Sequence, residues 1–134
     1  MLRIVLALLL LGPAVTAFAQ GKSRMTGTAA VLEQWDADHD GTLDLSEVKK
    51  AAQAKFDALD RDHEGTLDAK ELRGRVSARE IRQNDPDQDK TIDKDEYMAL
   101  VEKRFKAADK DNDGTLDKKE LNSKAGKALL RLIQ

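Results

Sequence analysis

The sequence contains no cysteine, and only two of its 134 residues are proline. Without cysteine the chain can form no disulfide, the usual staple of small proteins in oxidising compartments, and it has no thiol nucleophile. Aromatic residues make up only 4% of the sequence, and a chain of this length buries a modest apolar core. We therefore expect a bound metal ion to add stability.

The sequence also lacks an excess of charge of one sign. It has 23 Lys and Arg against 25 Asp and Glu, a formal net charge of −2, so we expect no nucleic-acid partner. No serine, histidine or lysine arrangement suggests a nucleophile or a general base. We expect no enzyme, and a secreted hydrolase is the remaining catalytic alternative.

Long hydrophobic runs are absent except at the N-terminus. Arg3 precedes an apolar run over residues 4–11, and Ala17-Phe18-Ala19 fits the site that signal peptidase cuts. The run is too short for a permanent membrane span. The sequence therefore predicts a signal peptide at 1–19 and a periplasmic or secreted protein, with a membrane-anchored N-terminus as the alternative.

One pattern, D-x-D-x-[DE]-[GK]-T-[LI]-D-x-x-E, occurs four times and begins at Asp36, Asp60, Asp85 and Asp109. Repeats of this kind indicate one supersecondary unit used several times. The spacing leaves room for a single helix between successive loops. We expect a flexible lead over residues 20–25 and a helix that includes Val31 before the first loop.

The first and third connectors carry apolar residues at helical spacing, and the pattern predicts continuous helices over 48–59 and 97–108. With the end of the preceding loop, such a connector has about fifteen helical residues and spans about 22 Å, which keeps the loops at its two ends apart. We therefore expect loops to pair between non-neighbours, such as loop 1 with loop 3.

The second connector, residues 72–84, differs from the other two. Gly74 weakens a helix, and Ser77-x-x-Glu80 can start a new one as a capping box. We predict a bend near 74–77, which divides the chain into residues 26–76, with loops 1 and 2, and residues 77–134, with loops 3 and 4 and a C-terminal helix. That helix, with basic residues and Leu129 to Ile133, is expected to cover the core, and contact with an anionic surface is the alternative.

The repeat resembles the calcium loop of the EF-hand family, which has ligands at positions 1, 3, 5, 7, 9 and 12 and glycine at position 6. The resemblance implies an all-α fold of helix–loop–helix repeats, with four calcium loops that share short connecting helices, and Ca²⁺ as the cofactor. The implied ligands are Asp36, Asp38, Asp40, Thr42, Asp44 and Glu47; Asp60, Asp62, Glu64, Thr66, Asp68 and Glu71; Asp85, Asp87, Asp89, Thr91, Asp93 and Glu96; and Asp109, Asp111, Asp113, Thr115, Asp117 and Glu120.

Two loops depart from the family pattern. Glu64 stands at position 5 of loop 2, and Lys90 replaces the position-6 glycine of loop 3, where positive φ costs about 1 kcal/mol. We therefore expect loops 1 and 4 to bind more tightly than loop 3. His39 and His63 occupy position 4, which is not a ligand position. Mg²⁺ is the nearest competitor, although the acid at position 12 suits the larger Ca²⁺.

These features predict calcium-ion binding in an exported protein that acts as a calcium buffer or a calcium-stabilised module. The alternative is a calcium-dependent sensor or docking module for an unidentified protein partner, as in the dockerins that the repeats partly resemble. Methionine is scarce, so a Met-rich groove like that of calmodulin-type sensors is absent from the sequence. Membrane contact is not expected after signal cleavage.

Overall fold

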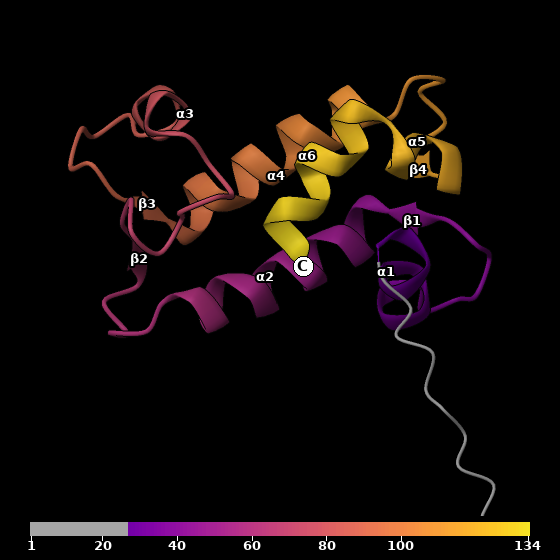
Figure 1. The fold of residues 1–134 in the computed structure, drawn as a ribbon, viewed down its shortest axis with the longest axis horizontal. Coiled ribbons are helices and arrows are strands. Elements are labelled where there is room, and N and C mark those ends of the chain that lie inside the picture. Colours follow the sequence, from indigo (N-terminus) through magenta and orange to yellow (C-terminus); the bar gives the residue numbers. More distant parts are fainter. Residues whose placement is uncertain (1–26) are drawn as a thin grey trace, which may run out of the picture.

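The computed structural model describes residues 27–134, so the predicted signal peptide at 1–19 and the predicted lead at 20–25 lie outside the described residues. The predicted all-α class of helix–loop–helix repeats is confirmed, and the structure adds only short two-residue strands (Figure 1). Within the described residues, every helix is too short or too polar to cross a bilayer. The elements in order are α1 (Thr28–Trp35), β1 (Leu43–Asp44), α2 (Leu45–Leu59), β2 (Thr66–Leu67), α3 (Ala78–Gln83), β3 (Ile92–Asp93), α4 (Lys94–Ala108), β4 (Thr115–Leu116), α5 (Lys118–Asn122) and α6 (Lys124–Ile133).

The two long helices, α2 and α4, confirm the predicted continuous connectors. Each has 15 residues and therefore spans about 22 Å. Each begins at a capping box, which Asp44 and Asp93 provide, and each ends at the first aspartate of the next loop. Helix α2 leads from loop 1 to loop 2, and α4 leads from loop 3 to loop 4, so neither pair of loops touches.

The loops pair through two-residue antiparallel strands. Strand β1 of loop 1 pairs with β4 of loop 4, and β2 of loop 2 pairs with β3 of loop 3. Pairing of loop 1 with the non-neighbour loop 4 follows from the rigid helix between loops 1 and 2. The suggested partner, loop 3, was wrong, and so was the expectation that loops pair only between non-neighbours. The bend before loop 3 turns the chain back and places this loop against its neighbour, loop 2.

That bend lies where the sequence predicts it. Loop 2 is followed by turns rather than by an α-helix, and Gly74 has a φ of 78°. Ser77 then caps α3 through the capping box with Glu80. The reversal makes α2 and α4 antiparallel, with one loop pair at each end of the molecule (Figure 1).

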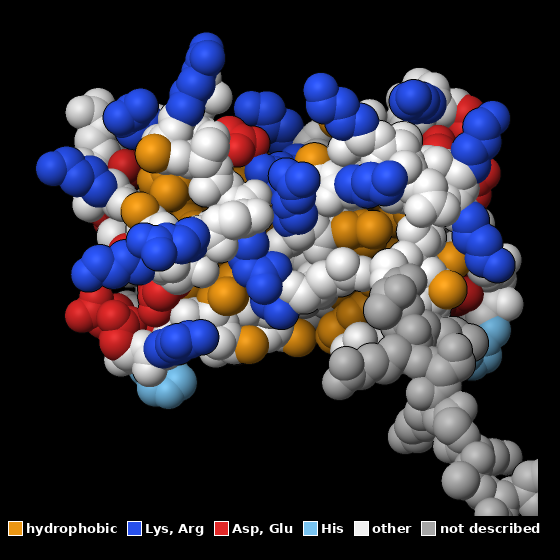
Figure 2. Space-filling view, in the orientation of Figure 1, with side chains coloured by type: hydrophobic (Ala, Val, Ile, Leu, Met, Phe, Trp, Pro, Cys, Tyr) orange, Lys and Arg blue, Asp and Glu red, His pale blue; other side chains and the backbone are white. Residues whose placement is uncertain are grey.

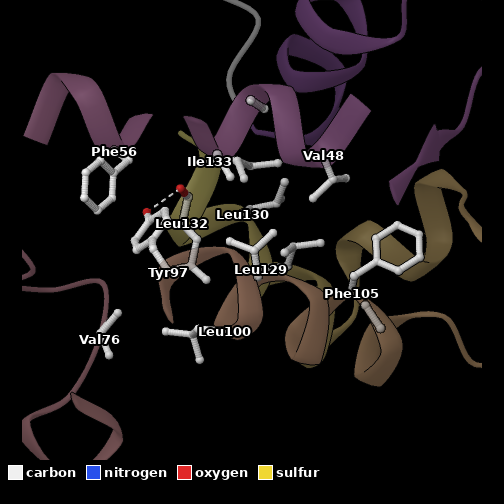
Figure 3. Close-up of a cluster of buried hydrophobic side chains, with 14 of the residues drawn as sticks. Val48, Phe56, Val76, Tyr97, Leu100, Phe105, Leu129, Leu130, Leu132 and Ile133 are labelled. Carbon is white, nitrogen blue, oxygen red and sulfur yellow. Dashed lines mark hydrogen bonds between the residues drawn. The ribbon is translucent and has the colours of Figure 1, made fainter. Parts of the chain in front are cut away.

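Helix α6 covers the apolar faces of α2 and α4, which confirms the expected role of the C-terminal helix (Figure 3). Leu129 and Leu132 are fully buried there, and Leu130 and Ile133 are 6% and 3% exposed. The hydroxyl of Tyr97 donates to the Leu132 carbonyl at 2.7 Å inside this core. Burial raises the pKa of Tyr97 to about 12, so the hydroxyl keeps the proton that it donates.

Candidate metal centre

Each loop begins with an aspartate that is held at the edge of the core. Asp36, Asp60 and Asp109 follow directly on α1, α2 and α4, and their backbone N–H groups close the last turn of those helices. The exposed fractions of the four position-1 aspartates lie between 5% for Asp85 and 8% for Asp60 and Asp109. Burial of a carboxylate is costly unless donors or a cation surround it.

The loop backbone supplies some of those donors. The N–H of the sixth residue donates to the position-1 carboxylate in all four loops, at 2.9 Å from Gly41, 3.0 Å from Gly65, 2.8 Å from Lys90 and 3.1 Å from Gly114. The predicted positive φ at this position is present, with 70° at Lys90 and 81–85° at the glycines.

The fourth residue of each loop also has positive φ, which was not predicted from the sequence. The angles are 59° at His39, 58° at His63, 60° at Gln88 and 57° at Asn112. Asn and His are enriched in this region of φ/ψ space, and this enrichment is the signal that could have indicated the turn. Both histidines are exposed, which agrees with their expected position outside the ligand set.

The carboxylates of each loop converge. Four groups have ligand oxygens within 4.8 Å of one another: Asp36, Asp38 and Asp40; Asp60, Asp62 and Glu71; Asp85, Asp87 and Glu96; and Asp109, Asp111 and Glu120. Positions 1 and 3 thus meet in every loop, and position 12 joins them in loops 2, 3 and 4. In loop 1 the third member is position 5 instead.

Positions 5 and 7 are tied together in three loops. The carboxylate of Asp40 accepts the N–H and the hydroxyl of Thr42, at 2.8 and 2.7 Å. The same two bonds join Asp89 to Thr91 and Asp113 to Thr115. Within the described residues, the side chain of Glu64 in loop 2 forms no such bond with Thr66. The position-5 side chain therefore has fewer hydrogen bonds to hold it in loop 2 than in the other loops.

Positions 9 and 12 exchange the two hydrogen bonds of a capping box, a motif that was predicted only at Ser77. In loop 1 the Asp44 carboxylate accepts the Glu47 N–H at 2.8 Å, and the Glu47 carboxylate accepts the Asp44 N–H at 3.0 Å. Asp68, Asp93 and Asp117 take the same part in their loops. The D-x-x-E spacing at the end of each repeat is the signal for this motif. Position 9 thus starts a helix in loops 1, 3 and 4, precedes turns in loop 2, and stays outside the converging groups.

Loop 3 has a second departure, at position 2. The position-12 glutamate accepts the N–H of residue 2 in loops 1, 2 and 4, at 2.7, 3.1 and 2.9 Å. Loop 3 has Pro86 at this position, and proline has no N–H to donate. Glu96 therefore lacks a bond that holds Glu47, Glu71 and Glu120 in place.

Crowding of carboxylates changes their proton affinity. A hydrogen bond shared with the Asp85 side chain, together with the charges of Asp89 and Asp85, raises the pKa of Asp87. Burial raises the pKa of Glu96, and the neighbouring Asp93, Asp87 and Asp85 add to this effect. A divalent cation would turn this repulsion into attraction.

The residues present fit a hard divalent cation. Within the described residues, the one buried side-chain oxygen without a hydrogen-bond partner is Oδ1 of Asp109, and it belongs to one of the four converging groups. A buried unpaired carboxylate oxygen among other carboxylates is costly without a cation. Groups made only of oxygen donors suit Ca²⁺ or Mg²⁺ rather than softer metals.

A family model described as EF hand matches residues 28–51, 53–83 and 100–123 of the chain. The chain belongs to the EF-hand family. These three segments contain loops 1, 2 and 4, whereas loop 3, with Pro86 and Lys90, lies outside them. No curated protein matches the chain significantly. EF-hand proteins bind Ca²⁺, and this EF-hand chain has several acidic groups able to hold the ion.

Proposed function

We propose that this EF-hand protein is exported and binds up to four Ca²⁺ through the residues at positions 1, 3, 5, 7, 9 and 12 of its loops. The observation that carries the proposal is the convergence of carboxylate oxygens in all four loops, with Asp109 Oδ1 buried and unpaired in loop 4. Position 7 contributes its backbone carbonyl, and position 9 acts through water because its side chain already accepts the N–H of the position-12 glutamate.

Loops 1 and 4 bind more tightly than loop 3 in this proposal. Loop 3 has a non-glycine residue at positive φ and lacks the donor at position 2, and both features reduce the order of its ligands before the ion arrives. Loop 2 has Glu64 in place of the tethered aspartate, and its affinity is expected to be lower than that of loops 1 and 4.

The role that the fold supports best is a calcium buffer or calcium-stabilised module. Helix α6 already occupies the apolar faces of α2 and α4, including Val48 and Phe105 (Figure 3). A sensor would need to expose such a surface to its partner when calcium binds. Ca²⁺ in the paired loops would instead tie both ends of α2 and α4 together and stabilise the folded state.

Calorimetric titration tests the sites one at a time. Glu→Gln at position 12 removes one negative ligand, so E47Q and E120Q are each expected to weaken one tight site by at least tenfold, whereas E96Q changes only the weakest binding step. Glu33→Gln makes the same chemical change on an exposed residue outside the loops and serves as the control. Isotherms that change equally for E33Q and E120Q would contradict the assignment.

Trp35 gives an optical readout of loop 1. It precedes the ligand Asp36 and packs, partly buried, against the core. Ordering of the loop by Ca²⁺ is expected to withdraw the indole from water and shift its emission to the blue. The double variant Asp36→Ala with Glu47→Gln should lose this shift. A parent emission that does not respond at saturating calcium would count against an ordered site in loop 1.

Export has its own test. Expression in a bacterium followed by cell fractionation and mass spectrometry is expected to find a mature chain that starts at Gln20 outside the cytoplasm. Leu8→Arg, which interrupts the apolar run, should leave the full-length chain inside the cell, whereas Leu8→Ile should have no effect. A full-length parent chain confined to the cytoplasm would contradict export and leave calcium binding untouched.

A further inference from the structure

Two segments far apart in the sequence lie side by side on one face of the molecule: residues 72–84 and helix α6. The Arg75 Nη1 atom donates to the carbonyls of Arg131 and Gln134, both at 2.6 Å. Arg104 donates to the carbonyls of Arg75 and Ala128, and thus holds both segments at a second point. These contacts fix the connector against the outer side of α6.

Lys and Arg side chains are spread over this face of the molecule (Figure 2), and six exposed ones belong to these two segments. We call this set the basic face, and it consists of Arg73, Arg79, Arg82, Lys124, Lys127 and Arg131, all of which are exposed. The one acid in residues 72–84 and 121–134 is Glu80, and its carboxylate already pairs with Arg104 at 2.9 Å. Among the described residues, no ion pair neutralises any member of the basic face.

A further cation crowds this region from α2. Burial lowers the pKa of Lys55, and the charge of Arg75 lowers it further. Like charges within interacting range destabilise a folded chain unless a counter-charge is present. The acids of the protein do not supply it, because nearly all of them lie in the loops at the two ends of the molecule.

We propose that the basic face docks the protein on an anionic phospholipid surface. Clusters of four to eight Lys and Arg on an amphipathic helix and its surroundings are typical of this interaction. Helix α6 buries its apolar side in the core, so the contact is electrostatic and peripheral, without insertion into the acyl chains. The spatial union of the two segments is not visible in the sequence, from which contact of the C-terminal helix with an anionic surface was only the alternative to its covering the core.

The chemistry disfavours single-stranded nucleic acid as the partner. Binding of that kind uses exposed aromatic side chains on which bases stack. In the described part of the chain, Phe56, Tyr97 and Phe105 are buried, and Trp35 packs against the core next to loop 1. The basic face spreads over a helix and a neighbouring connector, which suits a planar array of phosphate groups.

Calcium should strengthen this docking, and this expectation rests on the proposed function. The net charge is −2, and four Ca²⁺ would add eight positive charges and reverse its sign. Without the ion, the acidic loop pairs at both ends of the molecule repel the same surface that attracts the basic face. With the ion, this repulsion is removed.

Vesicle co-sedimentation of the full chain tests the proposal. The probes are phosphatidylcholine vesicles with and without phosphatidylglycerol. The N-terminal region carries Arg3, Lys22 and Arg24 beside its apolar run and is the same in the parent and in every variant, so the change that each variant causes is the readout. At saturating calcium and low salt we expect binding at least tenfold tighter to the anionic vesicles, and K124E/K127E/R131E should remove most of that difference. The control K50E/K103E/K106E makes the same charge change on exposed residues of α2 and α4. It should keep most of the difference in binding between the two vesicle types.

Several outcomes would overturn the docking proposal. These are equal binding to both vesicle types, equal losses in the basic-face and control variants, and binding to soluble heparin without binding to anionic vesicles. If circular dichroism shows that the α6 variant does not fold, R79E/R82E on α3 replaces it, with the same expected loss. If calorimetry shows Ca²⁺ binding but the protein does not bind the anionic vesicles, the docking proposal is wrong and the calcium proposal stands. If the protein binds the vesicles but no Ca²⁺, the calcium proposal is wrong.

Discussion

At the scale of single residues, the sixth loop position separates loop 3 from the other loops. Gly41, Gly65 and Gly114 have φ of 81–85°, and Lys90 has φ of 70°. A side chain with a Cβ adopts this region at a cost of about 1 kcal/mol, whereas glycine does so freely. The backbone N–H of Lys90 still donates to Asp85 at 2.8 Å, so the loop forms but carries the cost.

Lys90→Gly is therefore expected to stabilise the apo protein by about 1 kcal/mol and to tighten calcium binding at loop 3, because the strain and one positive charge near the ligands are removed together. Urea unfolding and calorimetry measure the two effects. Gly114→Lys in loop 4 is the reciprocal control, and it is expected to lower both the stability of the apo protein and the calcium affinity of loop 4. A Lys90→Gly protein that is no more stable and binds no more tightly would show that the turn carries no strain.

At the scale of the element, the position of α6 depends on its close approach to α5. Ser123 ends α5 and caps α6, and its hydroxyl accepts the Gly126 N–H at 3.0 Å. A Cβ on Gly126 would lie 2.1 Å from the Glu120 carbonyl oxygen and 2.6 Å from the Leu121 Cα. Only glycine lets α6 fold back at this angle over the faces of α2 and α4.

Gly126→Ala is expected to destabilise the protein by about 3 kcal/mol, because the backbone of α5 cannot yield and α6 must leave its place in the core. Denaturant unfolding measures the loss, and an apolar dye should bind the surface that α6 uncovers. Gly74→Ala is the control, since a Cβ there meets nothing within 4 Å and only the positive φ of 78° opposes it. If both variants lose the same stability, close packing at Gly126 is not what positions α6.

At the scale of the whole molecule, the strand pairs decide which loops influence one another. Leu43 lies opposite Leu116, and Leu67 lies opposite Ile92. All four side chains are fully buried, so a change in the backbone of one loop acts directly on its partner. The two pairs stand at opposite ends of α2 and α4, which are long and rigid.

Asp36→Ala with Glu47→Gln is therefore expected to weaken calcium binding at loop 4 more than at loops 2 and 3, with a coupling of about 1 kcal/mol to loop 4. The amides of Gly65, Lys90 and Gly114 donate to the position-1 carboxylates, so their NMR signals report each loop during a titration. The matching double variant in loop 2, Asp60→Ala with Glu71→Gln, should affect loop 3 instead. Equal effects on all remaining loops would contradict coupling through the strand pairs.

The sequence by itself determined the repeat, the loops and the two long helices. Regular spacing of carboxylates identifies a loop because its ligands are local, and apolar spacing identifies a helix for the same reason. Gly74 and the Ser77 capping box likewise located the bend. The strain at Lys90 followed from the glycine that the other loops have at this position.

Only the tertiary structure decided which loops pair, because pairing joins residues far apart in the chain, such as Leu43 and Leu116. The direction in which the chain turns after Gly74 sets the partners, and local spacing does not encode that direction. The same holds for the basic face, since the bonds of Arg75 to α6 bring together cations that the sequence separates. Local conformation depends on neighbouring residues, whereas the packing of helices and loops depends on the burial of apolar faces that lie far apart in the sequence.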